Sequence, residues 1–229
     1  MSAEVQQMFA TIARRYDAAN DLLSLGVHKG WRRRAVQLSG AAPGQRVLDC
    51  ATGTGDLALA FKRAVGPPGE VLGTDFCREM LDSAPAKAAR AGLEVKFEVA
   101  DALSLPYPAR RFDVASIAFG IRNVDDPLRC LRELSRVVVP GGRVVVLEFG
   151  QPGGIFGALF RFYSRVVMPL IGGLVTGNRR AYEYLPRTAA AFPAGERFLA
   201  LMREAATFSE VSATPLLFGT AFVYLGVVR

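Results

Sequence analysis

The chemically most informative stretch of the chain is a glycine-rich turn that follows a short apolar run. Asp49 ends the run, and Gly53 and Gly55 follow it. Glycines let a backbone bend tightly and let a ligand come close to it. A helix that begins directly after such a turn also presents free N–H groups and the positive end of its dipole. Strand, turn and helix together predict a binding site for a nucleotide-like ligand.

Two cofactors fit a turn of this kind. Residues 53–58 match the dinucleotide fingerprint G-x-G-x-x-A. The pyrophosphate of a dinucleotide would lie over the helix end, close to the carboxylate of Asp49, which repels it. S-adenosylmethionine carries an ammonium and a sulfonium and no phosphate, so this carboxylate favours it. A tight strand–helix connection without a ligand is the third interpretation.

Two further acids follow the next predicted strands. Asp75 ends the run 70–75 and lies near the offset of roughly 20 residues expected for a ribose-binding carboxylate. Asp101, next to Ala102, follows the alternating run 95–99, where it could accept a hydrogen bond from an adenine amino group. Either acid alone could be a loop residue or a helix cap. Acids at three successive strand ends favour one shared ligand.

These acids require elements that bring the strand ends together. The patterns predict strands over residues 46–50, 70–75, 95–99, 112–119, 142–149, about 209–214 and about 218–228. They predict helices over about 4–15, 30–39, 55–65, 78–91, 126–138 and near 194–206. Such alternation predicts a doubly wound α/β sheet with helices on both faces, which binds ligands beyond the carboxyl ends of its strands. A break at Pro215 predicts that the last two strands form an antiparallel pair.

The segment after Gln151 departs from this alternation. Residues 155–175 are apolar and helical in pattern, but Arg161, Arg165 and Pro169 interrupt them, as does a glycine pair. A spanning helix needs about 20 mostly apolar residues, so we do not expect a membrane span. The segment could cover the sheet, or it could form a mobile apolar lid beside the site that touches a membrane surface.

Length and composition indicate one domain with a substantial core. The chain has 229 residues, of which 51% are hydrophobic, and this excludes a disordered chain. We expect an N-terminal helical cap over about 1–40 and a lid or substrate region over about 151–195. The three cysteines have no metal-binding spacing, so we expect reduced thiols and no metal site.

Charge and the N-terminal pattern bear on partners. The net charge of +7 could face solvent, an anionic lipid surface or nucleic acid. The N-terminus has no signal-peptide pattern. We expect a cytoplasmic protein, with peripheral contact to the inner face of the membrane and without a nucleic-acid partner. A homo-oligomer is compatible with the sequence.

The assembled pattern resembles the class I S-adenosylmethionine-dependent methyltransferases, which have a Rossmann-like, seven-stranded sheet whose last strand is antiparallel. Residues 16–24, with His28 and Trp31, are similar to the N-terminal signature of the quinone C-methyltransferases of menaquinone and ubiquinone synthesis. Residues 119–124 are similar to the second signature of that family. The similarity spans nearly the whole chain, from Met8 to Val228.

Three departures from the family pattern occur near the expected site, and one of them is Asp101, where several relatives have an asparagine. Ala19 replaces the methionine that is usual before Asn20, and Ala118 replaces a serine that helps to hold the cofactor in some relatives. A contact with the cofactor at Ala118 would therefore be absent or made by the backbone. The resemblance further implies that S-adenosylmethionine is contacted by Thr54, Asp75, Asp101 and Ala102.

The resemblance implies a reaction as well. The substrate would be a polyprenylated hydroquinone that is methylated on a ring carbon. Our main interpretation is the conversion of demethylmenaquinol to menaquinol, and the alternative is the benzoquinol of the ubiquinone pathway. A nucleic-acid methyltransferase would carry an Asn/Asp-Pro-Pro-Tyr/Phe element after the fourth strand, which residues 119–123 do not match. An NAD-dependent oxidoreductase would need a proton-donor pair that is not evident.

Methyl transfer to a ring carbon needs electron density on the ring, which deprotonation of a hydroquinone hydroxyl supplies. Arg122 follows the fourth predicted strand, and family precedent makes this position catalytic. A guanidinium is not deprotonated in proteins, which argues against a free base, so we expect Arg122 to stabilise the phenolate. A surface salt bridge is the alternative role of Arg122.

The remaining candidates come from the two signatures. His28 is the only histidine and could accept the hydroxyl proton or be structural. Asn123 could orient the substrate oxygen or cap the next helix. Tyr16 and Asp17 could line the ring pocket, whereas Trp31 is expected in the core.

Overall fold

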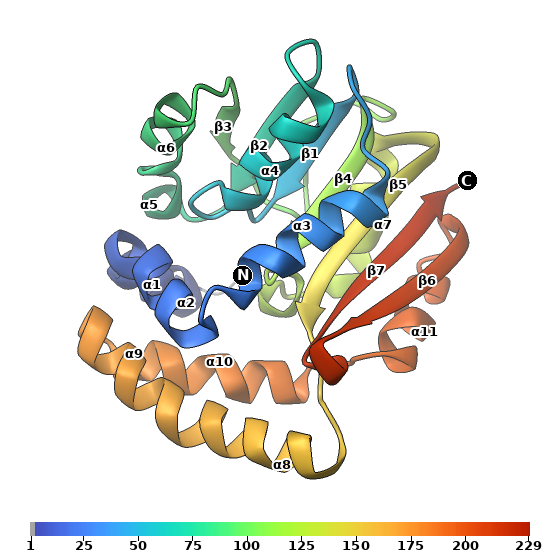
Figure 1. Cartoon of the computed structure of the whole chain (residues 1–229). Helices are drawn as coiled ribbons and strands as arrows, with labels where there is room; N and C mark the ends of the chain where they lie inside the picture. Colours follow the sequence, from blue (N-terminus) through green and yellow to red (C-terminus); the bar gives the residue numbers. More distant parts are fainter. Residues whose placement is uncertain (1–2) are drawn as a thin grey trace.

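A seven-stranded sheet forms the centre of the protein, with helices against both faces (Figure 1). The computed structural model describes residues 3–229, except the side chains of Ala3, Arg14 and Arg179. The strand order is β3-β2-β1-β4-β5-β7-β6. The strands are β1 Arg46–Cys50, β2 Glu70–Asp75, β3 Lys96–Val99, β4 Phe112–Ala118, β5 Val138–Phe149, β6 Phe208–Leu216 and β7 Ala221–Val228.

The direction of the strands confirms the predicted fold class. Strands β1 to β5 pair in parallel, and β7 pairs antiparallel with both β5 and β6. The strand order reverses between β1 and β4, where Asp49 is in register with Ser116. A reversal of this kind opens a crevice at the carboxyl ends of the strands. The predicted site therefore has the sheet geometry that it requires.

Helices bury the central strands on both faces. In β1, Val47 belongs to one apolar cluster and Leu48 to the other, because alternate side chains point to opposite faces. Ala35 and Phe61 belong to the same cluster as Val47, and Leu131 belongs to the cluster of Leu48. The helices concerned are α3 Val27–Ser39, α4 Asp56–Val65, α7 Pro127–Val137 and α11 Glu196–Glu204.

The N-terminal cap contains a helix that the sequence patterns did not predict. The expected helix over 4–15 is α1 Ala3–Ile12 with a 3₁₀ turn, and α2 Tyr16–Ser24 follows it. Leu25 and Gly26 adopt left-handed conformations, which end α2 and turn the chain into α3. Helix α3 therefore begins at Val27 rather than at residue 30. Met1 and Ser2 of the predicted cap lie outside the described residues.

One long helix replaces the broken one that we expected over 155–175. Helix α8 Gly154–Phe162, a π-helical turn Tyr163–Val167 and helix α9 Met168–Thr176 are continuous over 23 residues. Pro169 lies just after the π-helical turn, where the α-helical hydrogen-bond pattern is already interrupted, so its missing N–H is tolerated. A Cβ on Gly172 would lie 2.3 Å from the ring of Tyr182, so this glycine permits close helix packing instead of breaking the helix.

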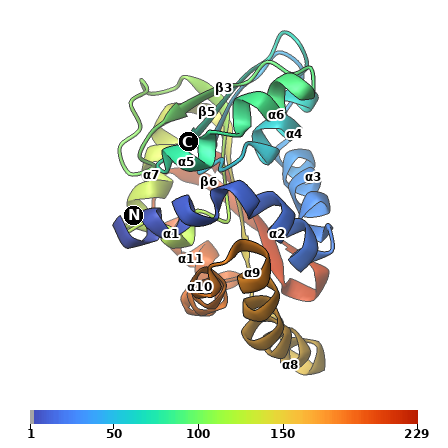
Figure 2. The same cartoon turned by 90° about the vertical axis from the view of Figure 1, so that its left-hand side faces the viewer.

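A helical layer lies beyond the carboxyl ends of the strands (Figures 1 and 2). It contains α1, α2, α8, α9 and the unpredicted α10 Arg179–Ala191, which the side chain of Asn178 caps. Ile12, Leu23 and Tyr182 are buried among the residues that hold this layer together. The layer covers the edge of the sheet at which ligands are expected.

Smaller corrections concern the bounds of elements. The expected helix 78–91 is divided into α5 Arg78–Leu81 and α6 Ala84–Arg90, because Pro85 in the first turn of α6 cannot continue a preceding helix. Strand β5 begins at Val138, before the expected residue 142. Strand β6 continues through Pro215, which an edge strand tolerates, and the predicted antiparallel pairing of β6 with β7 is confirmed.

Candidate active site

Two adjoining cavities lie between the sheet and the helical layer. The larger has a volume of about 350 Å³, within the range of about 300 to 1,000 Å³ that is typical of ligand pockets. The smaller, of about 80 Å³, lies at the carboxyl ends of β1, β2 and β4. Tyr16 and Phe119 line both cavities. Groups bound in the two cavities can therefore meet beside these two residues.

The smaller cavity brings together most of the predicted cofactor residues. Its lining includes Gly53, Asp75, Asp101, Ala102 and Ala118. The carboxylate of Asp75 accepts hydrogen bonds from the backbone N–H groups of Gly53 and Cys77, each at 2.9 Å. These bonds hold the glycine turn against the end of β2, and burial raises the pKa of Asp75.

The chemistry of this cavity fits a cationic nucleoside better than a dinucleotide. Of the described residues, those that line it include two carboxylates and no Lys, Arg or His. Carboxylates can accept hydrogen bonds from ribose hydroxyls and from an adenine amino group, whereas a pyrophosphate would find no cation. Gly53 has φ +56°, and a Cβ on Gly120 would lie 2.5 Å from that of Ala51. Small residues at these positions keep the backbone accessible to a ligand.

Three predicted cofactor residues lie behind the cavity and not on its wall. Asp49 is fully buried and accepts hydrogen bonds from the hydroxyls of Thr52 at 2.6 Å and Ser116 at 2.7 Å. Burial raises the pKa of Asp49 to about 6. The prediction that the carboxylate of Asp49 contacts a cationic ligand directly is therefore wrong, because this carboxylate is buried and is hydrogen-bonded to Thr52 and Ser116.

Thr54 and Gly55 are the other two residues that do not line the cavity. The hydroxyl of Thr54 donates a hydrogen bond to Asp17 on α2 at 2.6 Å. Gly55 has φ +86° at the start of α4 and lies against Phe97. Thr54 therefore ties the cap to the glycine turn, and Gly55 shapes that turn.

Arg122 lines the larger cavity and is held by a buried ion pair. Its Nη1 donates hydrogen bonds to the carbonyl of Phe119 and to the carboxylate of Glu148, both at 2.7 Å. The two side chains are 2% and 1% exposed, so the alternative of a surface salt bridge is wrong. The guanidinium also lies over the ring of Phe149. Its Nε and the second oxygen of Glu148 have no hydrogen-bond partner.

His28 also lines the larger cavity and is buried. Its Nε2 lies 2.7 Å from a carboxylate oxygen of Asp21, and its Nδ1 accepts a hydrogen bond from Nη1 of Arg32. Burial, followed by the neighbouring charge of Arg32, lowers the pKa of His28. The imidazole is therefore neutral near pH 7. Trp31 packs against one of the apolar core clusters, as expected, and it also lines the same cavity.

Tyr16 and Asn123 mark the boundary of the cavities. Tyr16 lines both, whereas Asn123 lines only the smaller one. The amide of Asn123 accepts a hydrogen bond from the hydroxyl of Tyr184 at 3.2 Å. It does not cap α7, because the carboxylate of Asp126 does so by accepting from the N–H of Arg129.

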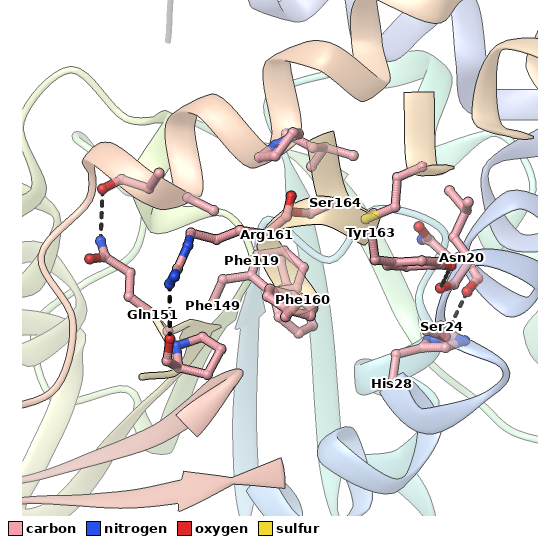
Figure 3. A pocket seen from close by; sticks show the side chains of 18 of the residues that line it. Asn20, Ser24, His28, Phe119, Phe149, Gln151, Phe160, Arg161, Tyr163 and Ser164 are labelled. Carbon is pink, nitrogen blue, oxygen red and sulfur yellow. Dashed lines mark hydrogen bonds between the residues drawn. The ribbon is translucent and has the colours of Figure 1, made fainter. Parts of the chain in front are cut away.

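Apolar rings dominate the rest of the larger cavity. Figure 3 shows Phe119, Phe149 and Phe160 gathered at its centre. The hydroxyl of Tyr163 donates a hydrogen bond to the backbone carbonyl of Leu23 at 2.7 Å, which connects the long helix to the cap. The cavity thus combines a cationic and basic part with an apolar part.

Sequence reasoning missed four polar residues of the site. Glu148 follows the apolar run of β5 directly, as Asp49 follows that of β1. The same search for acids after apolar runs could therefore have found it. Asp21 lies inside a recognised signature, but its role depends on the unpredicted turn between α2 and α3. Arg32 belongs to a basic run without a periodic signal, and Tyr184 lies on the unpredicted α10.

Fold and site together define a class I methyltransferase. The sequence profile of the ubiE/COQ5 methyltransferase family matches residues 1–228, and the chain belongs to this family. It is 52% identical over 226 residues to a protein from Bdellovibrio bacteriovorus named ubiquinone/menaquinone biosynthesis C-methyltransferase UbiE, covering 98% of this chain and 96% of that one. It is 51% identical over 220 residues to the demethylmenaquinone methyltransferase of Thermus thermophilus, covering 96% and 99%.

Solved structures of lower identity share the fold. A SAM-dependent methyltransferase from Thermotoga maritima superposes with a TM-score of 0.68 at 20% identity, covering 97% of this chain and 99% of that one. The [4+2]-cyclase SpnF superposes with a TM-score of 0.64 at 21% identity, covering 91% and 73%. Because one of these proteins is named a cyclase, the shared fold does not by itself define a reaction.

Proposed function

We propose that this protein uses S-adenosylmethionine to methylate a ring carbon of a prenylated hydroquinone. The observation that supports this most is the pair of adjoining cavities. One is acidic and free of cations along its described lining, and the other contains Arg122 and His28 beside apolar rings. The names of the relatives above agree with this reaction.

The cofactor would lie in the smaller cavity. The carboxylate of Asp75 would accept from ribose hydroxyls, and Asp101 with Ala102 would contact the adenine. When bound, S-adenosylmethionine supplies an electrophilic methyl group. The donor would have to place that group near Tyr16 and Phe119, since the two cavities meet there.

The chain's own residues prepare the ring for attack. A hydroquinone that has lost a hydroxyl proton carries negative charge on oxygen and on the adjacent ring carbon. The guanidinium of Arg122, which the buried Glu148 holds in place, stabilises this charge. Water is excluded by apolar side chains of the larger cavity, among them Trp31, Phe119, Phe149, Phe160, Met168 and Leu185.

Our choice of substrate is demethylmenaquinol, which would be converted to menaquinol. The alternative is the benzoquinol of the ubiquinone pathway, and the relatives' names include both pathways. The purified protein should be incubated with methyl-labelled cofactor and short-tailed forms of both quinols. We expect label in the naphthoquinol. Label in the benzoquinol alone would support the alternative, and binding of S-adenosylhomocysteine without transfer to either quinol would contradict the proposed reaction.

We also propose that the long helix lies on a membrane surface. Among the described helices, Gly154–Thr176 is long and apolar enough to cross a membrane by length and composition. One of its faces packs on α10, where Pro169 and Gly172 are buried. The other exposes apolar side chains, namely Ile155, Leu159, Phe162, Val166, Leu170 and Leu174. An amphipathic helix of this kind suits an interface better than a span.

Vesicle flotation tests this contact. At high salt, where attraction between the charges is screened, the double substitution Leu159→Glu/Leu174→Glu should abolish flotation with vesicles of mixed neutral and anionic phospholipid. The matched control is Val99→Glu on edge strand β3, which is also exposed and should float like the unchanged protein. If neither the unchanged protein nor the control floats with the vesicles, the proposed contact is contradicted.

A further inference from the structure

The pair Asp21 and His28 has a geometry that suits the handling of a proton. Asp21 lies in the last turns of α2, and His28 in the first turn of α3. The left-handed Leu25 and Gly26 fold the two helices onto each other, which brings the carboxylate within 2.7 Å of the imidazole Nε2. The second oxygen of Asp21 is 2.7 Å from the ammonium of Lys29. The carboxylate is thus charged and fixed on both sides.

The partners of His28 determine its tautomer. Arg32 can only donate hydrogen bonds, so the Nδ1 that it contacts must be an unprotonated acceptor. The single proton of the neutral ring is then on Nε2, which donates it to Asp21. The basic nitrogen of His28 is therefore Nδ1, and it is covered by a side chain that lines the substrate cavity.

Arg32 has a second partner within reach. Its Nη1 lies 3.8 Å from the carboxylate of Asp56, at the first residue of α4. A small rotation of the guanidinium toward Asp56 would uncover Nδ1 without leaving the cation unpaired. Arg32 thus covers the basic nitrogen of His28, and the carboxylate of Asp56 lies close enough to pair with the guanidinium once it moves away.

We propose that Asp21 is a positioning residue that presents Nδ1 of His28 as the acceptor of the quinol hydroxyl proton, and that Arg32 uncovers Nδ1 when substrate binds. This proposal depends on the proposed function and adds to it a base, its orienting carboxylate and a gating arginine. Neither Asp21 nor Arg32 touches the reacting carbon.

The protons balance around this pair. The hydroxyl O–H bond breaks, its proton forms an N–H bond at Nδ1, and its electron pair stays on the quinol oxygen. The new carbon–carbon bond would form as the donor's carbon–sulfur bond breaks and leaves its electron pair on sulfur, which would give a neutral ring ketone. This ketone would lose the ring proton to water and become a phenolate again. The imidazolium then returns its proton to that oxygen. One proton leaves to solvent for each methyl group transferred.

The pH dependence of kcat/KM tests the proposal, because it reports the base in the free enzyme. The charged groups that face His28 are Asp21 on α2, Arg32 on α3 and Asp56 on α4. Protonation of His28 removes the acceptor, so activity falls on the acid side. Arg32 lowers the pKa of His28, so Arg32→Gln should move this fall to higher pH. Asp21 raises the same pKa, so Asp21→Asn should move the fall to lower pH.

Asp21→Asn should also lower kcat on the order of 10-fold to 100-fold, because an asparagine amide can donate to Nε2 and select the wrong tautomer. The control is Asp82→Asn, an equal change of charge at an exposed position. It should leave both kcat and the pH profile unchanged. Binding of S-adenosylhomocysteine should be equal in all variants, which shows that each is folded.

The outcomes separate this proposal from the proposed function. Opposite shifts of the acid limb in Asp21→Asn and Arg32→Gln support the pair, since a purely structural contact would not move the limb in two directions. If the protein methylates quinol but the pH profiles of both variants superimpose on that of the unchanged protein, the proposed roles of Asp21 and Arg32 are overturned and the proposed function stands. No methylation of quinol by the unchanged protein overturns the function itself.

Discussion

At the scale of single residues, Arg122 combines a buried cation with access to the substrate cavity. We predict that Arg122→Met keeps the binding of S-adenosylhomocysteine, because the residue does not line the smaller cavity. The kcat should fall on the order of 10² to 10³, the usual cost of losing a donor that stabilises a developing anion. Calorimetry and a turnover assay measure the two quantities. An unchanged kcat would remove Arg122 from the mechanism.

Glu148 should matter for stability as well as for turnover. Glu148→Gln removes the charge that compensates Arg122, and breaking a buried pair costs about 3–5 kcal/mol in the free energy of unfolding. Urea unfolding measures this loss. The double variant Arg122→Met/Glu148→Leu replaces the pair by apolar groups and should regain most of the stability while staying inactive. If Glu148→Gln unfolds at the same urea concentration as the unchanged protein, the ion pair between Arg122 and Glu148 does not contribute to stability.

Asp49 should make stability depend on pH. Its folded-state pKa of about 6 exceeds the ordinary value of 3.8, so the folded protein is favoured while this carboxyl is protonated. The contribution is complete below about pH 4 and is lost as the pH rises through 6, by about 3 kcal/mol. Asp49→Asn should remove this loss. Unfolding free energies of the two proteins from pH 4.5 to 7.5 should therefore converge toward acid and diverge toward neutral pH.

At the scale of elements, the strands could be predicted and several helices could not. Apart from the alternating β3, each strand of the parallel part contains a short apolar run, and acids such as Asp75 mark strand ends. Helices α2 and α10 bury side chains in one cluster around Tyr182, so their stability depends on packing between segments that are far apart in the sequence. Pro169 suggested a break because proline interrupts helices, but the helix continues through the π-helical turn that precedes it.

The candidate site divides along the same line. Asp75, Asp101, Ala102 and the residues of the glycine turn follow from strand ends. The position of Asp49 behind the cavity could not be predicted, because it depends on the hydroxyl of Ser116 on a neighbouring strand. The partners of His28 were also hidden, since they depend on how α2 folds onto α3.

The cap is fastened to the sheet by Lys87 on α6. Its ammonium is bonded to Asp17 on α2, to the hydroxyl of Thr54 at 3.0 Å and to Asp56 at 2.8 Å. Phe9 and Tyr16 of the cap line the smaller cavity, so an outward movement of the cap would open it. We predict that Lys87→Met speeds the release of S-adenosylhomocysteine about tenfold, which corresponds to about 1.4 kcal/mol.

Stopped-flow displacement of a fluorescent analogue measures this release rate. The matched control is Lys96→Met, which removes an exposed lysine whose nearest carboxylate is 3.8 Å away on Glu70. Its release rate should equal that of the unchanged protein. If Lys87→Met releases the cofactor no faster, the cap is not held closed by this cluster.

At the scale of the whole molecule, the exposed apolar surface includes the turn between β6 and β7. Leu217 and Phe218 are exposed there although both have positive φ values, +39° and +55°. Such conformations are unfavourable for large side chains, and the protein's own core gains nothing from them. The ring of Phe218 lies 5.1 Å from that of Phe156, which joins the turn to α8. The turn and the long helix thus form one apolar surface.

This surface and the net charge of +7 should act on a membrane in different ways. Attraction between the charge and anionic lipid is screened by salt, with a Debye length of about 8 Å at 0.15 M, whereas burial of apolar side chains in the interface is not. Flotation with anionic vesicles should therefore weaken as salt rises but reach a plateau above zero. Phe218→Glu should lower the plateau and leave the salt-dependent part, and the control Val99→Glu should keep both. If binding of the unchanged protein vanishes at high salt, only charge holds it to the lipid, and the apolar surface must serve another partner.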